Sequence, residues 1–246
     1  MTPGRARLLA LAAYPLAPYL WLQGQQLRRR IPQLPEAAGP RQGSIQGDGH
    51  PITLVVMGES TAAGVGVATQ AQGLAALLAA AVARETGRTV FWHTVAASGL
   101  TLRQMRRQLV PAVARLQPDA VLLAAGVNDV LHLQTAAGYG RQLERLALRL
   151  QKKMGSVIPL LVSPVPDLGL FPALPAPLRE ILSARAYFLQ AASGRMCRTL
   201  EAVVQLPRLP ESVYTAEMFA ADGFHPGAAG YRLWAELAAR ELRTLF

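Results

Sequence analysis

From residue 51 to the end of the chain, short apolar runs of strand length alternate with longer segments of helical periodicity. The apolar runs are continuous, as in strands that are covered on both faces. Since helices separate them, we expect an α/β protein, a three-layer α/β/α sandwich with a mostly parallel five-stranded sheet. The predicted strands are 52–57, 89–95, 120–125, 157–162 and 202–206. The predicted helices are 73–86, 102–116, 136–153, 178–200 and 228–245.

The first 50 residues do not follow this pattern. We therefore divide the chain into an apolar and basic N-terminal segment (1–30), a linker rich in Pro, Gly and Gln (31–50), and the α/β domain (51–246). The apolar stretch 8–22 contains two prolines, follows Arg5 and Arg7, and precedes three arginines at 28–30. As a helix it would span about 22 Å, less than the roughly 30 Å hydrocarbon core of a bilayer. A membrane span is therefore not expected.

Three interpretations of this N-terminal segment remain open. Aromatic residues and arginines at the end of the apolar stretch favour a segment seated at a membrane interface, and so a membrane-associated protein. A cleaved signal peptide would make the protein exported, although the residues after the stretch are poorly suited to cleavage. A helix packed on the domain would be compatible with a cytoplasmic protein.

The net charge of +10 comes almost wholly from 23 arginines. Arg141, Arg145, Arg149 and Lys153 recur at a spacing of four, which places them on one helix face. Such a face is either solvated or directed toward an anionic membrane surface, and no nucleic-acid partner is expected because no binding motif is present. The single cysteine, Cys197, excludes an internal disulfide, and the four scattered histidines predict no metal site.

Two short polar motifs supply the residue types of a nucleophilic site, and a third supplies a hydrogen-bond donor. Ser60 comes directly after the first predicted strand, while Asp222 and His225 precede the last predicted helix. A neutral histidine can accept the proton of a serine hydroxyl, and a carboxylate can orient the imidazole. Each motif alone also fits a helix cap or a surface turn, and it is their combination that indicates acyl-transfer chemistry.

The same chemistry needs hydrogen-bond donors for a developing oxyanion. Asn128, in Gly126-Val127-Asn128-Asp129 after the third predicted strand, offers a side-chain amide. The backbone N–H groups of Gly99 and Ser60 are further candidates, and Asp129 is expected to brace the loop that carries Asn128.

On these residues the chain resembles the SGNH (GDSL-type) hydrolase family, from about residue 52 to residue 246. The resemblance implies the flavodoxin-like fold of that family, with Ser60 as nucleophile, His225 as base and Asp222 as the acid that orients it. It also implies an oxyanion hole formed by Ser60, Gly99 and Asn128. There are two departures: the usual Gly-Asp-Ser-Leu is Gly-Glu-Ser-Thr here, and the second block lacks its frequent Asn.

The expected function is that of an esterase or lipase-like serine carboxylester hydrolase, acting on a small-molecule or lipid-like acyl ester through an acyl-enzyme, without metal or organic cofactor. Two alternatives use the same fold: an acyltransferase with the same triad, and a non-catalytic lipid-binding protein. The proline-rich loop 163–177, with Leu168, Leu170, Phe171 and Leu174, either walls the site or packs on its own domain.

Overall fold

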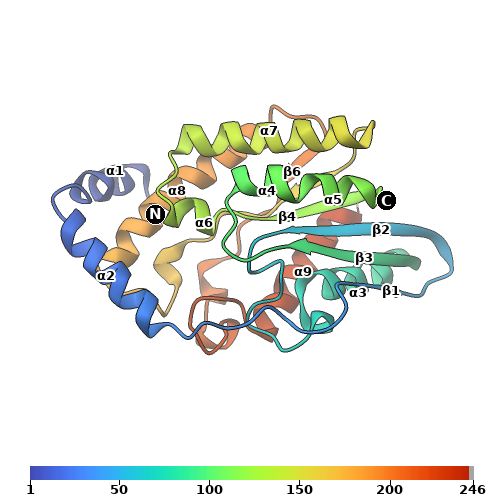
Figure 1. Cartoon of the computed structure of the whole chain (residues 1–246), viewed down its shortest axis with the longest axis horizontal. Helices are drawn as coiled ribbons and strands as arrows, with labels where there is room; N and C mark the ends of the chain where they lie inside the picture. The colour runs from blue at the N-terminus through green and yellow to red at the C-terminus, as the bar shows by residue number, and fades with distance from the viewer. Residues whose placement is uncertain (244–246) are drawn as a thin grey trace.

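The computed structural model describes residues 1–243, which build a six-stranded sheet between two layers of helices (Figure 1). The strands are β1 (Gln42–Ile45), β2 (Gly49–Gly58), β3 (Arg88–Ala96), β4 (Ala120–Ala124), β5 (Leu160–Val162) and β6 (Val203–Gln205). Their order in the sheet is β1-β3-β2-β4-β5-β6. Strands β2 to β6 run parallel to one another, and β1 pairs with β3 in the antiparallel direction. The predicted α/β class is thus confirmed.

The strands are apolar at successive positions because helices cover both faces of the sheet. Val55 and Met57 of β2 belong to the hydrophobic cluster beneath α4 (Leu102–Gln108), α5 (Val110–Arg115), α7 (Ala136–Met154) and α8 (Leu178–Cys197). Leu54 and Val56 point the opposite way, into the cluster beneath α3 (Leu74–Thr86) and α9 (Ala228–Arg243). Successive side chains of a strand alternate between faces, so a strand between two helical layers needs apolar residues at every position.

The remaining helices are short or lie outside the two layers. They are α1 (Pro3–Ala12), α2 (Ala17–Arg30), α6 (Val127–Leu131) and the 3₁₀ turns η1 (Gln70–Gln72), η2 (Leu168–Leu170), η3 (Glu211–Val213) and η4 (Ala216–Met218). The predicted helix 228–245 corresponds to α9, and its expected end at residues 244 and 245 lies outside the described residues.

The expected linker 31–50 contains the sixth strand. Strand β1 pairs with β3 along its whole length, and β2 begins at Gly49, three residues earlier than expected. A Cβ on Gly43 would lie 2.8 Å from the indole of Trp92, so glycine lets β1 approach that ring. An edge strand needs few apolar residues because only its backbone must be paired, and its polar composition concealed it in the sequence.

Prolines interrupt the predicted helix 102–116 and also the N-terminal apolar stretch 8–22. The segment 102–116 forms α4 and α5, which meet at Leu109 two residues before Pro111. The stretch 8–22 belongs to α1 and α2, and the turn between them, residues 13–16, contains Pro15 and precedes Pro18. Proline lacks an N–H and its ring collides with the preceding helical turn, which explains both breaks. Among the described residues, no helix has the length and apolar character needed to cross a membrane.

Tyr231 of α9 ties the C-terminal helix to the loop that follows β2. Its side chain is fully buried, and its hydroxyl lies 2.7 Å from the carbonyl oxygen of Val65 and 3.0 Å from that of Thr61. A hydroxyl has one proton to donate, so the two carbonyls share it. The contact therefore holds the loop that follows β2 against α9, the last helix of the chain.

We expect Tyr231→Phe to lower the free energy of unfolding by about 1–3 kcal/mol, because it leaves buried carbonyl oxygens without their donor. Urea denaturation measures this change. Tyr14→Phe is the matched control, since Tyr14 is 80% exposed, and it should stay within about 0.5 kcal/mol of the unaltered protein. Equal stabilities for the two variants would show that the hydroxyl does not hold the loop.

Candidate active site

Two strand ends that lie side by side in the sheet bring the polar motifs of Ser60 and Asn128 together. Gly58 at the end of β2 is paired with Ala124 at the end of β4. A Cβ on Gly58 would stand 2.1 Å from the carbonyl oxygen of Ala124, so only glycine permits this approach. Ser60 and Asn128 therefore begin their loops next to each other, at the carboxyl edge of the sheet where α/β proteins bind ligands.

Ser60, His225 and Asp222 form one chain of hydrogen-bonding contacts. Ser60 Oγ lies 3.0 Å from His225 Nε2, and His225 Nδ1 lies 2.6 Å from Asp222 Oδ2. The other carboxylate oxygen, Asp222 Oδ1, accepts hydrogen bonds of 2.9 Å from the backbone N–H groups of Phe224 and His225. The structure thus brings together residues that are 165 positions apart in the chain.

The carboxylate of Asp222 is kept ionised inside the protein. Burial alone would raise the pKa of Asp222, but the hydrogen bonds from the imidazole and from the backbone N–H groups of His225 and Phe224 outweigh burial and lower it. A charged Asp222 favours a proton on His225 Nδ1. Nε2 is then left free to accept the hydroxyl proton of Ser60.

Close backbone packing fixes the loops that carry Ser60 and His225. Gly66 has a φ of +103°, and a Cβ there would lie 2.3 Å from the carbonyl oxygen of Pro226. The carbonyl of His225 accepts a 2.8 Å hydrogen bond from the backbone N–H of Ala220. With Tyr231 on its other side, the Ser60 loop is held between α9 and the turn that presents the imidazole.

Glu59 connects the Ser60 loop to the Asn128 loop. Its carboxylate is buried and accepts 3.0 Å hydrogen bonds from the backbone N–H groups of Val127 and Asn128. Burial raises the pKa of Glu59 to about 8, and the charge of Asp129 acts in the same direction, against the effect of these hydrogen bonds. The extra methylene of Glu59 is therefore accommodated in a direct bridge between the two strand ends.

Asp129 braces the same loop, as the sequence predicts. Its Oδ2 accepts a 3.0 Å hydrogen bond from the backbone N–H of Leu102 at the start of α4, and burial raises its pKa to about 6. The side chain of Asn128 donates a 3.3 Å hydrogen bond to the carbonyl of Leu100, next to Gly99. This hydrogen bond places the turn after β3 beside Asn128. Gly99 in that turn has a φ of +82°, which favours glycine.

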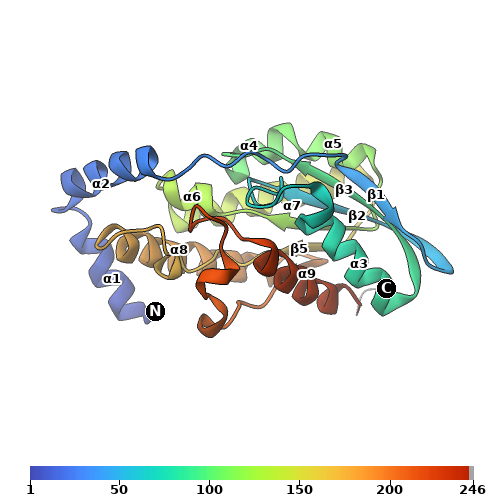
Figure 2. The same cartoon turned by 90° about the horizontal axis from the view of Figure 1, so that it is seen from below.

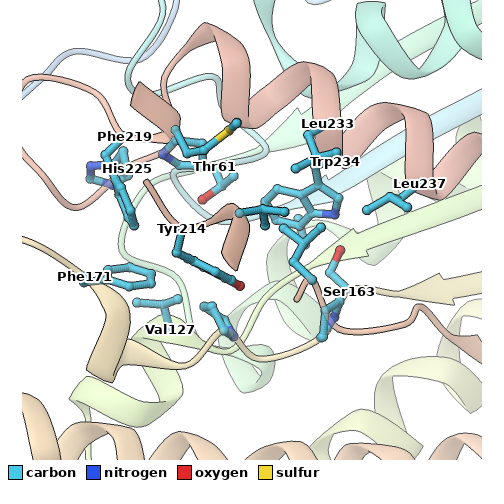
Figure 3. A pocket seen from close by; sticks show the side chains of 18 of the residues that line it. Thr61, Val127, Ser163, Phe171, Tyr214, Phe219, His225, Leu233, Trp234 and Leu237 are labelled. Carbon is cyan, nitrogen blue, oxygen red and sulfur yellow. The ribbon is translucent and has the colours of Figure 1, made fainter. Parts of the chain in front are cut away.

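An apolar pocket with a cavity of about 120 Å³ opens beside Ser60 and His225 (Figure 3). Its walls come mainly from the segment after β6 and from α9. They include Leu206, Leu209, Val213, Tyr214, Met218, Phe219, Leu233, Trp234 and Leu237. Thr61 and Val127, from the loops after β2 and β4, also line it.

The loop 163–177 forms part of the pocket wall, through Ser163, Pro164, Pro166 and Phe171. Phe171 packs edge-on against Phe219 and Phe224 there. Leu168 and Leu174 are buried in the core. Sequence reasoning missed Tyr231 and the main pocket walls, because aromatic and aliphatic residues at helical spacing look the same whether they face a core or a cavity.

Comparison with known proteins agrees with this arrangement. The model of the GDSL-like lipase/acylhydrolase family matches residues 56–233. A GDSL-like esterase of Mycobacterium tuberculosis is 33% identical over 199 residues, which make up 78% of this chain and 62% of that protein. The chain thus matches less than two thirds of the length of this relative.

Two solved structures share the fold. The crystal structure of TesA is 25% identical with a TM-score of 0.63, over 79% of this chain and 99% of that one. The psychrotrophic esterase EstA from Pseudoalteromonas sp. is 16% identical with a TM-score of 0.61, over 78% of this chain and 97% of that one. At its identity, EstA shows likeness of fold alone. Because the family model covers most of the sequence, the chain belongs to the GDSL-like lipase/acylhydrolase family.

Proposed function

We propose that this protein is a serine carboxylester hydrolase that cleaves acyl esters through Ser60, His225 and Asp222 and an acyl-enzyme intermediate. The observation that carries the proposal is the hydrogen-bonded chain from Ser60 Oγ to His225 Nε2 at 3.0 Å and from His225 Nδ1 to Asp222 at 2.6 Å. Serine needs an adjacent base to become a nucleophile, and the base needs an orienting acid.

In the first half of the reaction, Ser60 Oγ attacks the ester carbonyl carbon while its proton passes to His225 Nε2. The carbonyl π electrons move to the oxygen and form a tetrahedral oxyanion. When this intermediate collapses, the C–O bond to the alcohol breaks and the imidazolium donates its proton to the leaving oxygen. Asp222, held charged, stabilises the imidazolium in between.

The second half repeats these steps with water. His225 Nε2 takes a proton from water as the water oxygen attacks the acyl carbon. The bond to Ser60 Oγ then breaks, Ser60 recovers its proton, and the carboxylic acid leaves. All proton transfers use side chains of the protein, so the chemistry requires no metal or organic cofactor.

We assign the oxyanion hole to the backbone N–H groups of Ser60 and Gly99 and the side-chain amide of Asn128. Glu59 supports this assignment because it binds the backbone of Asn128 directly beside Ser60. The bond from Asn128 to Leu100 also keeps the amide next to the Gly99 turn. Donors fixed before the reaction stabilise the transition state without having to reorganise during it.

The pocket indicates esters with an apolar acyl group. The pocket begins at the nucleophile, and most of the side chains around it cannot donate hydrogen bonds. A hydrocarbon chain would bury its surface there, whereas a polar acyl group would lose its hydration without compensation. The acyl chain would extend from Ser60 toward Trp234 and Leu237 of α9.

Ser60→Ala should abolish hydrolysis of p-nitrophenyl esters and covalent labelling by a fluorophosphonate probe, because it removes the attacking oxygen. Circular dichroism should show an unchanged fold. Ser44→Ala, on the edge strand β1, is the matched control and should keep both activities. Normal turnover by a folded Ser60→Ala protein would refute the assigned nucleophile.

Asn128→Ala should reduce kcat by about 10²–10³ with a much smaller change in KM, because the lost donor acts on the charge of the transition state. Steady-state kinetics with a short-chain ester measures both constants. A thermal melt separates this effect from unfolding. A stable variant with nearly normal kcat would mean that other groups hold the oxyanion.

Leu237→Trp should shorten the range of accepted acyl chains, because the larger ring fills the pocket. We expect kcat/KM for an eight-carbon acyl ester to fall about 10-fold or more, while the acetyl ester is affected little. Leu148→Trp, at a site 50% exposed on α7, is the control. Equal losses for both esters would place the acyl chain elsewhere, and failure to cleave any ester would instead count against the proposed function.

A further inference from the structure

The two N-terminal helices present large apolar side chains to solvent. Their exposed fractions run from 36% to 80%, and they are seven of the twelve large apolar residues that are exposed in the described part of the chain. They are Leu8, Leu11, Tyr14, Leu16, Tyr19, Trp21 and Leu22. We refer to residues 3–30, which form α1, α2 and the turn between them, as the N-terminal hairpin. An apolar concentration of this kind marks an interaction surface.

Helix α1 also carries large apolar side chains on the side that faces solvent. Helix α1 contacts α8, and its one buried residue is the small Ala6. Leu8 and Leu11 are 70% and 66% exposed. A helix that serves only to cover a domain places its large apolar residues inward. Packing on α8 therefore does not account for the outward leucines.

The hairpin is fixed to the body of the protein at the end that holds the site. Gln23 of α2 donates a 2.8 Å hydrogen bond to the carbonyl of Ala176 and accepts a 3.3 Å bond from the backbone N–H of Leu178. Ala176 lies at the end of the loop 163–177, whose Phe171 lines the pocket, and Leu178 is the first residue of α8. Figures 1 and 2 both place α1 and α2 beyond the end of the sheet where α6 follows β4.

The charge of the N-terminal region is entirely positive. Residues 1–35 contain five arginines and neither Asp nor Glu. All five side chains, which are Arg5, Arg7, Arg28, Arg29 and Arg30, are exposed, and none forms an ion pair within residues 1–243. Three of them form the last turn of α2, and the first half of the same helix carries the exposed rings of Tyr19 and Trp21.

We propose that the N-terminal hairpin is the docking surface of this protein for an anionic lipid bilayer. The exposed leucines and aromatic rings enter the boundary between headgroups and acyl chains, and the arginines bind lipid phosphate groups. Tyrosine and tryptophan suit this boundary because their rings have an apolar body and a polar edge. Docking would hold the site end close to the lipid surface, and it does not depend on the proposed esterase activity.

Co-sedimentation of the full-length protein with vesicles tests the charge component. The protein should bind phosphatidylcholine vesicles that contain phosphatidylglycerol, bind pure phosphatidylcholine much less, and dissociate as salt rises. Changing Arg28, Arg29 and Arg30 together to Gln should weaken binding on the order of 100-fold. The matched control changes Arg141, Arg145 and Lys153 to Gln, three exposed cations on α7, and should bind nearly as well as the unaltered protein.

A second set of variants tests the apolar component. Leu8→Gln with Leu11→Gln should reduce vesicle binding without lowering the melting temperature, because both side chains are exposed in the folded protein. Leu133→Gln with Leu148→Gln, at sites 66% and 50% exposed outside the hairpin, is the control. Insertion should also shift the Trp21 fluorescence to the blue, and Trp21→Phe should remove that shift.

Three results would overturn the proposal. The first is absence of binding to anionic vesicles at low salt. The second is an equal loss of binding in the α7 control, which would assign the contact to that helix. The third is a full-length protein that self-associates through Leu8 and Leu11 and does not bind vesicles, which would make the hairpin an interface between copies of the chain.

Discussion

The site depends on the close approach of two parallel strands and on one buried carboxylate at their ends. Gly58 lets β2 lie directly against β4, and Glu59 then binds the backbone that follows β4. One residue further along the chain is Ser60. The hydroxyl of Ser60 and the amide of Asn128 are therefore positioned from a common anchor, and a shift in either strand end would be transmitted to both.

Burial makes this anchor costly to ionise, since it raises the pKa of Glu59 to about 8. The two oxygens of the Glu59 side chain nevertheless each accept a hydrogen bond from a backbone N–H group. The main contribution of Glu59 is therefore to hold the backbone after β4 in one orientation. It gives the backbone N–H groups of Val127 and Asn128 a partner that does not exchange with water, and so fixes the turn that starts α6.

The sequence allowed prediction of the parallel sheet from its hydrophobic pattern, and of the grouping of Ser60, His225 and Asp222 from the combination of their residue types and the resemblance to the SGNH family. Continuous apolar runs indicate strands covered on two faces, and their carboxyl ends must gather at one edge. The pocket was not predictable in the same way. Trp234 and Leu237 have the spacing of core residues, and only the path of the segment after β6 leaves a cavity in front of them. Strand β1 was missed because its stability comes from backbone pairing with β3.

Tyr231 and His225 lie near the C-terminal end of the chain, but their side chains contact the loop around Ser60. Ser60 precedes His225 by 165 residues. The ribosome therefore synthesises Ser60 long before His225. Domains generally fold as units, so this domain is not complete until α9 has been made. Under the proposed mechanism, a nascent chain that still lacks His225 has no base for the Ser60 hydroxyl and cannot cleave esters.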